Sequence, residues 1–434
     1  MMNTHEIKHI SLHDIASCQA DYDPAALPVE QAQHIIQQFI TAIHSTEKLA
    51  IRQALGRTLA ADIVSGINVP AHNNSAMDGY ALIGADLSKD RHIELKIIGT
   101  AFAGRAFDGE VEQGECIRIM TGGVMPTNCD TVIPQELTLN ANEHRVTVPA
   151  GKINIGDNCR LKGEDLALGK TALRKGKILR PADLGLLASL GIAEVPVQRR
   201  LRVAFFSTGD ELRSLGETLD EGCVYDSNRY TLYGMLQRLG CDMIDMGVIK
   251  DEPTALKEAF RNACENADAI ITSGGVSVGA ADYTKQCMAE LGDVAFWTIG
   301  MRPGRPMAFG KIHLHGKSAY LFGLPGNPVA VMVTFYFFVR NALLHMMGAK
   351  CPPLPLVRAT SQHAIRKRPG RTEYQRGILS TANDGSMQVV ITGSQGSGIL
   401  RSMSEANCMV VLHHDQSNVF AGDAVDVLLF EGLV

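Results

Sequence analysis

The alternation of apolar and polar positions divides the chain into segments of different secondary structure. Between Leu201 and about Gly348, apolar runs of strand length alternate with stretches of helical period. These runs predict strands at 202–206, 243–248, 269–272, 294–297 and 319–322, and helices at 227–239, 253–266, 282–291 and from 328 onward. Strands separated by helical crossovers are typical of βαβ units, so residues 194–350 are predicted to form an α/β domain with a parallel sheet covered on both faces.

The regions around this domain have a different pattern. Residues 65–168 contain short β-rich runs broken by Gly, Pro, Asn and Asp, and residues 351–434 contain short apolar runs between turn residues. Helical periodicity at 28–64 and 169–193 predicts a helical linker domain, and the polar residues 1–27 are predicted to be a loosely held extension. The predicted fold class is an α/β multidomain chain in which a central parallel-sheet domain is flanked by mostly β domains.

Length and composition support several folded domains and argue against some partners. The chain has 434 residues, which exceeds the size at which one hydrophobic core keeps growing. Its net charge of −5 is too mild to predict binding to nucleic acid or to a membrane surface. The longest apolar run, 329–339, is shorter than the roughly 20 residues that a membrane helix needs. Ten dispersed cysteines and no secretory signal predict reduced thiols in the cytoplasm.

Loops that follow the strands of a parallel sheet are the expected place for a ligand, because helix N-termini point their N–H groups there. One such loop, SGGVSVGAAD, offers small residues that could surround a phosphate or another oxyanion: Ser273, Gly274, Gly275, Ser277 and Gly279. It lacks the G-K-[ST] ending of a nucleotide P-loop, and a bare tight turn explains the same residues. The GLPGNP loop, with Pro325 and Asn327, leaves the same two interpretations open.

Four carboxylates are predicted on the same rim of the sheet: Asp210, Glu211, Asp251 and Asp282. Carboxylates beside a phosphate repel it unless a hard cation such as Mg²⁺ lies between them, which implies a divalent metal. Asp251 and Asp282 are also natural helix N-caps, and Asp210 and Glu211 could form an exposed turn. Together the four acids favour a functional site.

Two arginines flank a rigid turn in the stretch WTIGMRPGRPMAFG. Arg302 and Arg305 stand three residues apart around Pro303 and Gly304. Planar guanidinium groups in a fixed arrangement suit an oxyanion such as phosphate or molybdate. A solvated surface pair is the alternative interpretation.

Several longer motifs together resemble one family, the molybdopterin molybdenumtransferases, which includes the E domain of gephyrin. They are NNSAMDGYA, RIMTGG, GED, FSTGDEL, YDSNRY, SGGVSVGAADYTK, RPGRP, GLPGNP and PGRTEYQRG, in family order from about residue 30 to the C-terminus. The resemblance implies an elongated homodimer of four-domain subunits. It implies that the second, β-rich domain of one subunit faces the α/β and C-terminal domains of its partner across the active-site cleft.

The resemblance also implies an activity. A member of this family takes adenylylated molybdopterin and molybdate, cleaves the phosphoanhydride with Mg²⁺, and releases AMP and the molybdenum cofactor. Molybdopterin adenylyltransferase and apo-molybdoenzymes are the implied protein partners. Matched position by position, the family's functional residues fall on Asp78, Thr121, Asp165, Glu211, Asp251, Asp282, Arg302, Arg376 and Ser397.

Roles can be proposed for these positions. Asp251 and Asp282 are expected to hold Mg²⁺ or to orient water, and the loop from Ser273 to Gly279 is expected to hold the terminal phosphate of the pterin. Pro325, Asn327 and Ser397 are expected to bind the cofactor, and the expected catalytic residues are Asp78, Thr121, Asp165, Glu211, Arg302, Arg305 and Arg376. Without the resemblance, Asp78 would be an ordinary loop acid, and Arg376 and Ser397 would be interpreted as surface residues.

The chain also departs from the family pattern. Arginines replace the usual lysines of the K-P-G-K-P turn, and Thr298 stands where a further lysine is common. Asn73, Ala280 and Ser394 replace Asp, an acid and His, respectively.

Two alternatives to molybdate insertion remain. One is the adenylyltransferase, which shares the α/β domain, and the other is a scaffold paralogue that binds molybdopterin without turnover.

Overall fold

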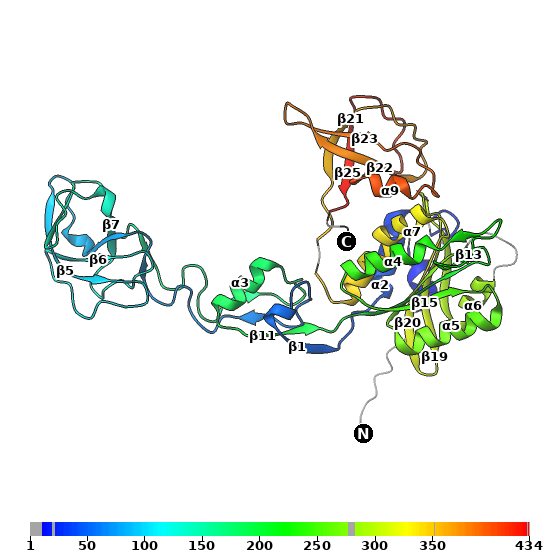
Figure 1. Cartoon of the computed structure of the whole chain (residues 1–434), viewed down its shortest axis with the longest axis horizontal. Coiled ribbons are helices and arrows are strands. Elements are labelled where there is room, and N and C mark those ends of the chain that lie inside the picture. Colours follow the sequence, from blue (N-terminus) through cyan, green and yellow to red (C-terminus); the bar gives the residue numbers. More distant parts are fainter. Residues whose placement is uncertain (1–10, 20–21, 277–282, 351, 432, 434) are drawn as a thin grey trace, which may run out of the picture.

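The computed structural model describes the whole chain except residues 1–10, 20–21, 277–282, 351, 432 and 434. The chain is elongated (Figure 1). A β-rich domain lies at one end, the α/β domain and the C-terminal β domain lie together at the other, and a narrow region containing β1, β11 and α3 joins them.

The α/β domain is built on a six-stranded sheet. Its strands, in spatial order, are β15 (Asp242–Ile249), β12 (Arg202–Thr208), β16 (Ala269–Ser273), β20 (Lys317–Leu324), β19 (Pro306–Leu314) and β17 (Gly292–Thr298). The pairs formed by β15, β12, β16 and β20 are parallel, whereas β19 is antiparallel to both of its neighbours. The prediction of a purely parallel sheet is therefore wrong at this edge, where the missed strand β19 forms a hairpin with β20 through a tight turn at His315 and Gly316, both with positive φ.

Helices cover both faces of this sheet. They are α4 (Ser227–Arg238), α5 (Pro253–Asn266), α6 (Tyr283–Leu291), and α7 (Pro328–Thr334) continuing through a π-helical turn into α8 (Arg340–Met346). Helices α5 and α6 pack on one face, where the rings of Phe206 and Phe260 lie 5.4 Å apart. The combined helix Pro328–Met346 is apolar and long enough to cross a membrane, but 72% of its apolar window is buried in the protein, so it is a core helix.

Segments from the N-terminal part of the chain complete the core on the other face. Helices α1 (Leu12–Ser17) and α2 (Val29–Phe39) bury Leu12, Ala16 and Ile35 in the same core as α4, α7 and α8. The backbone N–H of Leu12 donates to Asp293, and the indole of Trp297 donates to the hydroxyl of Tyr22. The prediction of a loosely held extension is wrong for the described part of residues 11–27. Helix α1 has only six residues and buries only Leu12 and Ala16, so its pattern was too weak to recognise.

The β-rich domain contains a five-stranded sheet. In spatial order its strands are β7 (Thr131–Pro134), β4 (Gly79–Leu82), β6 (Glu115–Ile119), β5 (Ile93–Ala101) and β8 (Arg145–Val148), with the short pair β3 (Asn74–Ser75) and β9 (Cys159–Arg160) beside it. The narrow region contains β1 (Thr46–Ala50) paired with β11 (Glu194–Gln198), β2 (Ile63–Val64) paired with β10 (Thr171–Leu173), and α3 (Pro181–Ser189). The chain thus passes through this region twice, once outward and once on its return.

The C-terminal domain is built on a further mixed sheet. Its elements are β21 (Val357–Ser361), β22 (Thr372–Thr381), β23 (Met387–Ile391), α9 (Arg401–Glu405), β24 (Cys408–Leu412) and β25 (Ala424–Leu429). A short strand from the α/β domain, β18 (Met301–Arg302), pairs with β22 and joins this sheet. The turn that contains the two arginines is therefore part of the joint between the two domains.

Candidate active site

A cavity of about 1100 Å³ lies at the carboxyl ends of β12, β16 and β20. Its walls come from the loops after these strands, from the arginine turn at 302–306, and from the C-terminal domain at 395–398. The short parallel pair β13 (Leu212–Arg213) and β14 (Val224–Tyr225) borders it. The cavity is where an open α/β sheet is expected to bind its ligand.

Many of the residues predicted from the sequence line this cavity: Glu211, Asp251, Ser273, Gly274, Gly275, Arg302, Arg305, Pro325, Asn327 and Ser397. Asp210, which was predicted on the same rim, does not line it. Ser277, Gly279, Ala280 and Asp282 lie outside the described residues. Asp78, Thr121 and Asp165 belong to the β-rich domain at the opposite end of the molecule (Figure 1).

The described part of the glycine loop requires glycine for steric reasons. Gly274 has φ +92°, and a Cβ there would lie 2.4 Å from the carbonyl oxygen of Thr208. Gly275 has φ +66°, and a Cβ there would lie 2.6 Å from the side chain of Thr284. Both conformations are rare for residues with a side chain. The loop is therefore pressed closely between β12 and α6, and its backbone lines the cavity.

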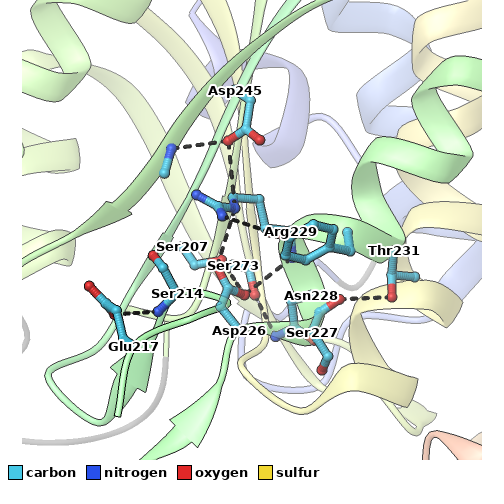
Figure 2. Close-up of polar contacts among 12 residues, drawn as sticks. Ser207, Ser214, Glu217, Asp226, Ser227, Asn228, Arg229, Thr231, Asp245 and Ser273 are labelled. Atoms are coloured by element: carbon cyan, nitrogen blue, oxygen red, sulfur yellow. Dashed lines mark hydrogen bonds and ion pairs between the residues drawn. The ribbon is translucent and has the colours of Figure 1, made fainter. Parts of the chain in front are cut away.

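A buried acid beside the cavity was missed by sequence reasoning (Figure 2). Asp226 is the N-cap of α4, and its Oδ1 accepts hydrogen bonds from the Ser207 hydroxyl at 3.0 Å and from the Arg229 N–H at 3.2 Å. Its Oδ2 lies 3.8 Å from Arg229 Nε and has no hydrogen-bond partner among the described residues. Asp226 is 2% exposed, so its charge is held inside the protein next to the binding cavity.

Asn228 connects three elements at the wall of the cavity. Its Nδ2 donates to the hydroxyl of Ser273 at 2.7 Å and to the carbonyl of Gly326 at 2.6 Å, as Figure 2 shows for Ser273. This side chain on α4 therefore fixes the end of β16 to the GLPGNP loop. The motif YDSNRY contains both Asp226 and Asn228, and an Asp followed by Ser and Asn before a helical period is a recognisable N-cap pattern.

Of the two acids considered as helix N-caps, only Asp251 lies within the described residues. Asp251 accepts a hydrogen bond from the Thr284 hydroxyl at 3.3 Å, and the N-cap of α5 is Glu252, which makes no side-chain cap bond. The N-cap interpretation is therefore wrong for Asp251. Glu211 is exposed and lines the cavity. Within the described residues, no group of three or more His, Cys, Asp or Glu side chains could hold a metal ion.

Arg376 is buried, with 1% exposure, so its interpretation as a surface residue is wrong. Its guanidinium donates to the Ser402 hydroxyl and to the Gly396 carbonyl, both at 3.0 Å. Burial, followed by the nearby charge of Arg302, lowers the pKa of Arg376 to about 10, which leaves it charged at neutral pH. Arg302 and Arg376 also border a second cavity, of about 280 Å³, on the C-terminal domain.

The loop that Arg376 holds also contacts the α/β domain. The carbonyl of Ser397 accepts a hydrogen bond from the backbone N–H of Val329, in the first turn of α7, at 3.0 Å. A helix N-terminus has N–H groups without intrahelical partners, and Ser397 satisfies one of them from another domain. This places Ser397 at the edge of the main cavity.

The predicted residues of the β-rich domain form a separate cluster. Asp78 Oδ1 accepts hydrogen bonds from the backbone N–H of Thr121 at 2.7 Å and from its hydroxyl at 2.8 Å. These two bonds lower the pKa of Asp78. Asp165 is exposed on a turn of the same domain, with its N–H bonded to the carbonyl of Val69. The structure therefore brings Asp78 and Thr121 together but keeps them away from the main cavity of their own chain.

Thr298 does not line the main cavity. It borders a different one, of about 550 Å³, which shares Arg305 with the main cavity. The lysine that the family often has at this position would therefore not add its charge directly to the main cavity.

Three regions of the chain match known protein families. Residues 27–191 match the MoeA N-terminal region (domain I and II), residues 204–345 match the probable molybdopterin binding domain, and residues 358–430 match the MoeA C-terminal region (domain IV). A molybdopterin molybdenumtransferase of Haemophilus influenzae is 40% identical over 410 residues, which cover 94% of this chain and 100% of that protein. The chain belongs to the molybdopterin molybdenumtransferase family. A second molybdenumtransferase, from a Nostoc species, is 35% identical and covers 92% of this chain and 93% of its own length.

A solved structure supports the same assignment for the fold. The molybdopterin biosynthesis MoeA protein of Pyrococcus horikoshii OT3 superposes with a TM-score of 0.79 at 30% identity, covering 93% of this chain and 100% of that one. The family resemblance, the α/β multidomain fold class and the assignment as an enzyme are therefore confirmed. This molybdenumtransferase is a transferase of molybdenum cofactor biosynthesis.

Proposed function

We propose that this molybdenumtransferase inserts molybdate into adenylylated molybdopterin and releases AMP in a Mg²⁺-dependent step. The main support is the composition of the main cavity. One space combines acids (Glu211 and Asp251), a glycine loop with exposed backbone and two arginines (Arg302 and Arg305). A phosphoanhydride and an oxyanion need this set of groups, because negative charge must be both bound and balanced.

The donor set fits a hard divalent cation. Asp251 offers carboxylate oxygens at the cavity wall, and the Thr208 hydroxyl is buried there without a hydrogen-bond partner among the described residues. Mg²⁺ prefers oxygen ligands, and bound there it would polarise the phosphoanhydride. Asp251 and Asp282 remain the proposed holders of the ion, although Asp282 lies outside the described residues.

The remaining residues have proposed roles in binding and positioning. Ser273 and the backbone of Gly274 and Gly275 bind the terminal phosphate of the pterin, with Ser273 oriented by Asn228. Arg302 and Arg305 attract molybdate and balance the charge that develops when water attacks a phosphorus of the phosphoanhydride. A new phosphorus–oxygen bond forms as the bond to the bridging oxygen breaks, and AMP and the pterin monophosphate are the products. Pro325, Asn327 and Ser397 contact the cofactor at the other walls.

Asp78, Thr121 and Asp165 enter this proposal through a second subunit. They lie in the β-rich domain, at the far end of their own subunit (Figure 1). We propose a homodimer in which this domain approaches the main cavity of its partner, so that Asp78 positions the pterin or moves a proton there. Molybdopterin adenylyltransferase is the proposed source of the substrate, apo-molybdoenzymes are the proposed acceptors, and the cytoplasm is the proposed location.

The test is single-turnover release of AMP from adenylylated molybdopterin with Mg²⁺, with and without molybdate. Release that depends on molybdate, with a product that activates an apo-molybdoenzyme, is the expected result. Tight binding of the pterin without release would contradict the proposal and favour the scaffold alternative. Glu211→Gln is expected to slow release, whereas Asp210→Asn, at a neighbouring acid that does not line the cavity, is the matched control.

A further inference from the structure

A further cavity of about 550 Å³ lies next to the main cavity. Its walls come from three parts of the chain: residues 25–28, the end of β17 with residues 298–301, and the C-terminal domain at 368–371 and 414. Arg305 lines both this cavity and the main one. The two cavities are therefore neighbours at this residue.

The polar groups of this cavity are almost all cationic or hydrogen-bond donors. Arg305, Arg368 and Arg371 line it together with the imidazole of His414, and no carboxylate is among its described lining residues. Arg371 is held by an ion pair with the buried Glu373, with Nε and Oε1 2.9 Å apart. Like charges brought together repel one another unless an anion lies between them. Glu373 compensates the charge of Arg371, whereas Arg305 and Arg368 are exposed and form no ion pair among the described residues. The guanidinium groups of Arg305 and Arg368 are therefore complementary to a doubly charged oxyanion.

A buried lysine joins the two loops of the C-terminal domain that line this cavity. Lys367 is 4% exposed, and its ammonium donates to the carbonyls of Arg368 at 2.8 Å, Gln416 at 3.3 Å and His414 at 3.4 Å. The N–H of Gly370 also donates to the carbonyl of His414, at 2.9 Å. A buried ammonium is costly unless its donors are satisfied, and here carbonyls satisfy it. The two loops that present Arg368 and His414 are consequently fixed to each other before any ligand arrives.

Hydrogen bonds also fix the opposite walls. The N–H of Thr298 donates to the carbonyl of Pro24 at 2.7 Å, and the N–H of Leu27 donates back to the carbonyl of Thr298 at 3.0 Å. The N–H of Gly300 donates to the carbonyl of Leu27 at 2.8 Å, and the N–H of Thr372 donates to the carbonyl of Gly300 at 2.9 Å. The backbones of the N-terminal segment, the α/β domain and the C-terminal domain are thus joined around this cavity, so the frame that carries its arginines is preorganised.

We propose that this cavity is a second oxyanion site that binds a tetrahedral dianion of the molybdate and phosphate class, next to the main cavity and joined to it by Arg305. Such a site raises the local concentration of the anion beside the place where it is used. The binding itself is independent of the reaction, whereas the assignment of molybdate as the physiological occupant rests on the proposed function.

The site is tested by diffraction from crystals of the full-length protein soaked in sodium molybdate, in which molybdenum is located by its anomalous scattering. A peak between Arg368 and Arg305 is expected in the wild type and is expected to be absent in Arg368→Gln. The matched control is Arg401→Gln, an 85% exposed arginine of the same domain that lines none of the described cavities. A parallel soak in molybdate with excess sodium phosphate shows which of the two anions the site prefers.

Kinetics provide an independent measurement. Arg368→Gln is expected to raise the KM for molybdate about tenfold and leave kcat unchanged, because loss of one charge-assisted hydrogen bond weakens binding by about that factor. A molybdenum peak confined to the main cavity, or a KM unchanged by Arg368→Gln, would overturn the second site. Normal AMP release in that case would leave the proposed function standing. A peak at Arg368 without AMP release would support the site and contradict the proposed function.

Discussion

The pairing of Asp78 with Thr121 gives an exposed carboxylate a lowered pKa, and it provides a test at the scale of single residues. Thr121→Val removes one of the two hydrogen bonds and is expected to raise the pKa of Asp78 toward its ordinary value. A carboxyl group whose pKa is lower in the folded than in the unfolded state stabilises the fold at pH values above its unfolded-state pKa. This stabilisation is lost as the pH falls through the folded-state pKa.

The measurement is an NMR pH titration of the side-chain carboxyl carbon of Asp78. Thr138→Val, another hydroxyl of the same domain that donates only to a backbone carbonyl, is the control. An unchanged pKa in Thr121→Val would show that the backbone N–H of Thr121 alone holds the carboxylate.

Arg376 provides a second test at this scale. Arg376→Lys keeps a positive charge but cannot donate to Ser402 and Gly396 from one planar group. The substitution is expected to lower the free energy of unfolding by about 1–3 kcal/mol and to slow AMP release by displacing Ser397. Urea denaturation measures the first effect. Arg358→Lys, at a largely exposed arginine of the same domain paired with Asp426, is expected to leave both quantities nearly unchanged.

Single residues also show what the sequence could reveal. The positions of Glu211, Asp251 and Arg302 at the main cavity could be predicted, because each residue follows a recognisable strand or stands in a distinctive turn. Arg376 could not be recognised as buried, because its burial depends on contacts with Ser394, Gly396 and Ser402, which are distant in the sequence. The role of a charged residue is decided by such long-range neighbours.

At the scale of elements, α4 holds the glycine loop through one side chain. Asn228→Ala removes the bonds to Ser273 and Gly326 and is expected to destabilise the protein by about 2 kcal/mol. Backbone amides of Gly274 and Gly275 are expected to exchange hydrogen faster, as measured by hydrogen–deuterium exchange. Thr231→Val on the same helix is the control, because its hydroxyl donates only to the carbonyl of Ser227 in its own helix. Equal exchange in the two variants would contradict the positioning role of Asn228.

Elements with long, regular patterns were predictable from the sequence, and short ones were not. The predicted helix at 253–266 has the same bounds as α5, because its apolar stripe is unambiguous. Strand β19 was missed because its apolar residues follow directly after the arginine turn and the turn determined the interpretation of the whole stretch. Helix α1 was missed because only Leu12 and Ala16 mark its buried side.

At the scale of the whole molecule, the distance between the Asp78 cluster and the main cavity makes the homodimer testable. Asp78→Ala and Glu211→Ala are each expected to abolish AMP release. In a mixture of the two refolded together, heterodimers contain one site in which both residues are intact, so about one quarter of the wild-type turnover is expected. Two variants of the same cavity, Glu211→Ala with Asp251→Ala, are the control and are expected to give no recovery. No recovery in the first mixture would mean that both residues act within one subunit.

The burial of α2 in the α/β core has a consequence for synthesis on the ribosome. Ile35 and Ile36 pack in the same core as Leu201, Phe309 and the helix at 328–346, yet the narrow region and the β-rich domain are translated in between. At 5–20 residues per second, α2 leaves the ribosome roughly 8–30 s before the first strand of its sheet. During that interval the β-rich domain can fold alone, while the apolar face of α2 stays uncovered and open to chaperones. We therefore expect the β-rich domain to fold first. The α/β core is expected to form last, because it needs segments from both sides of the β-rich domain.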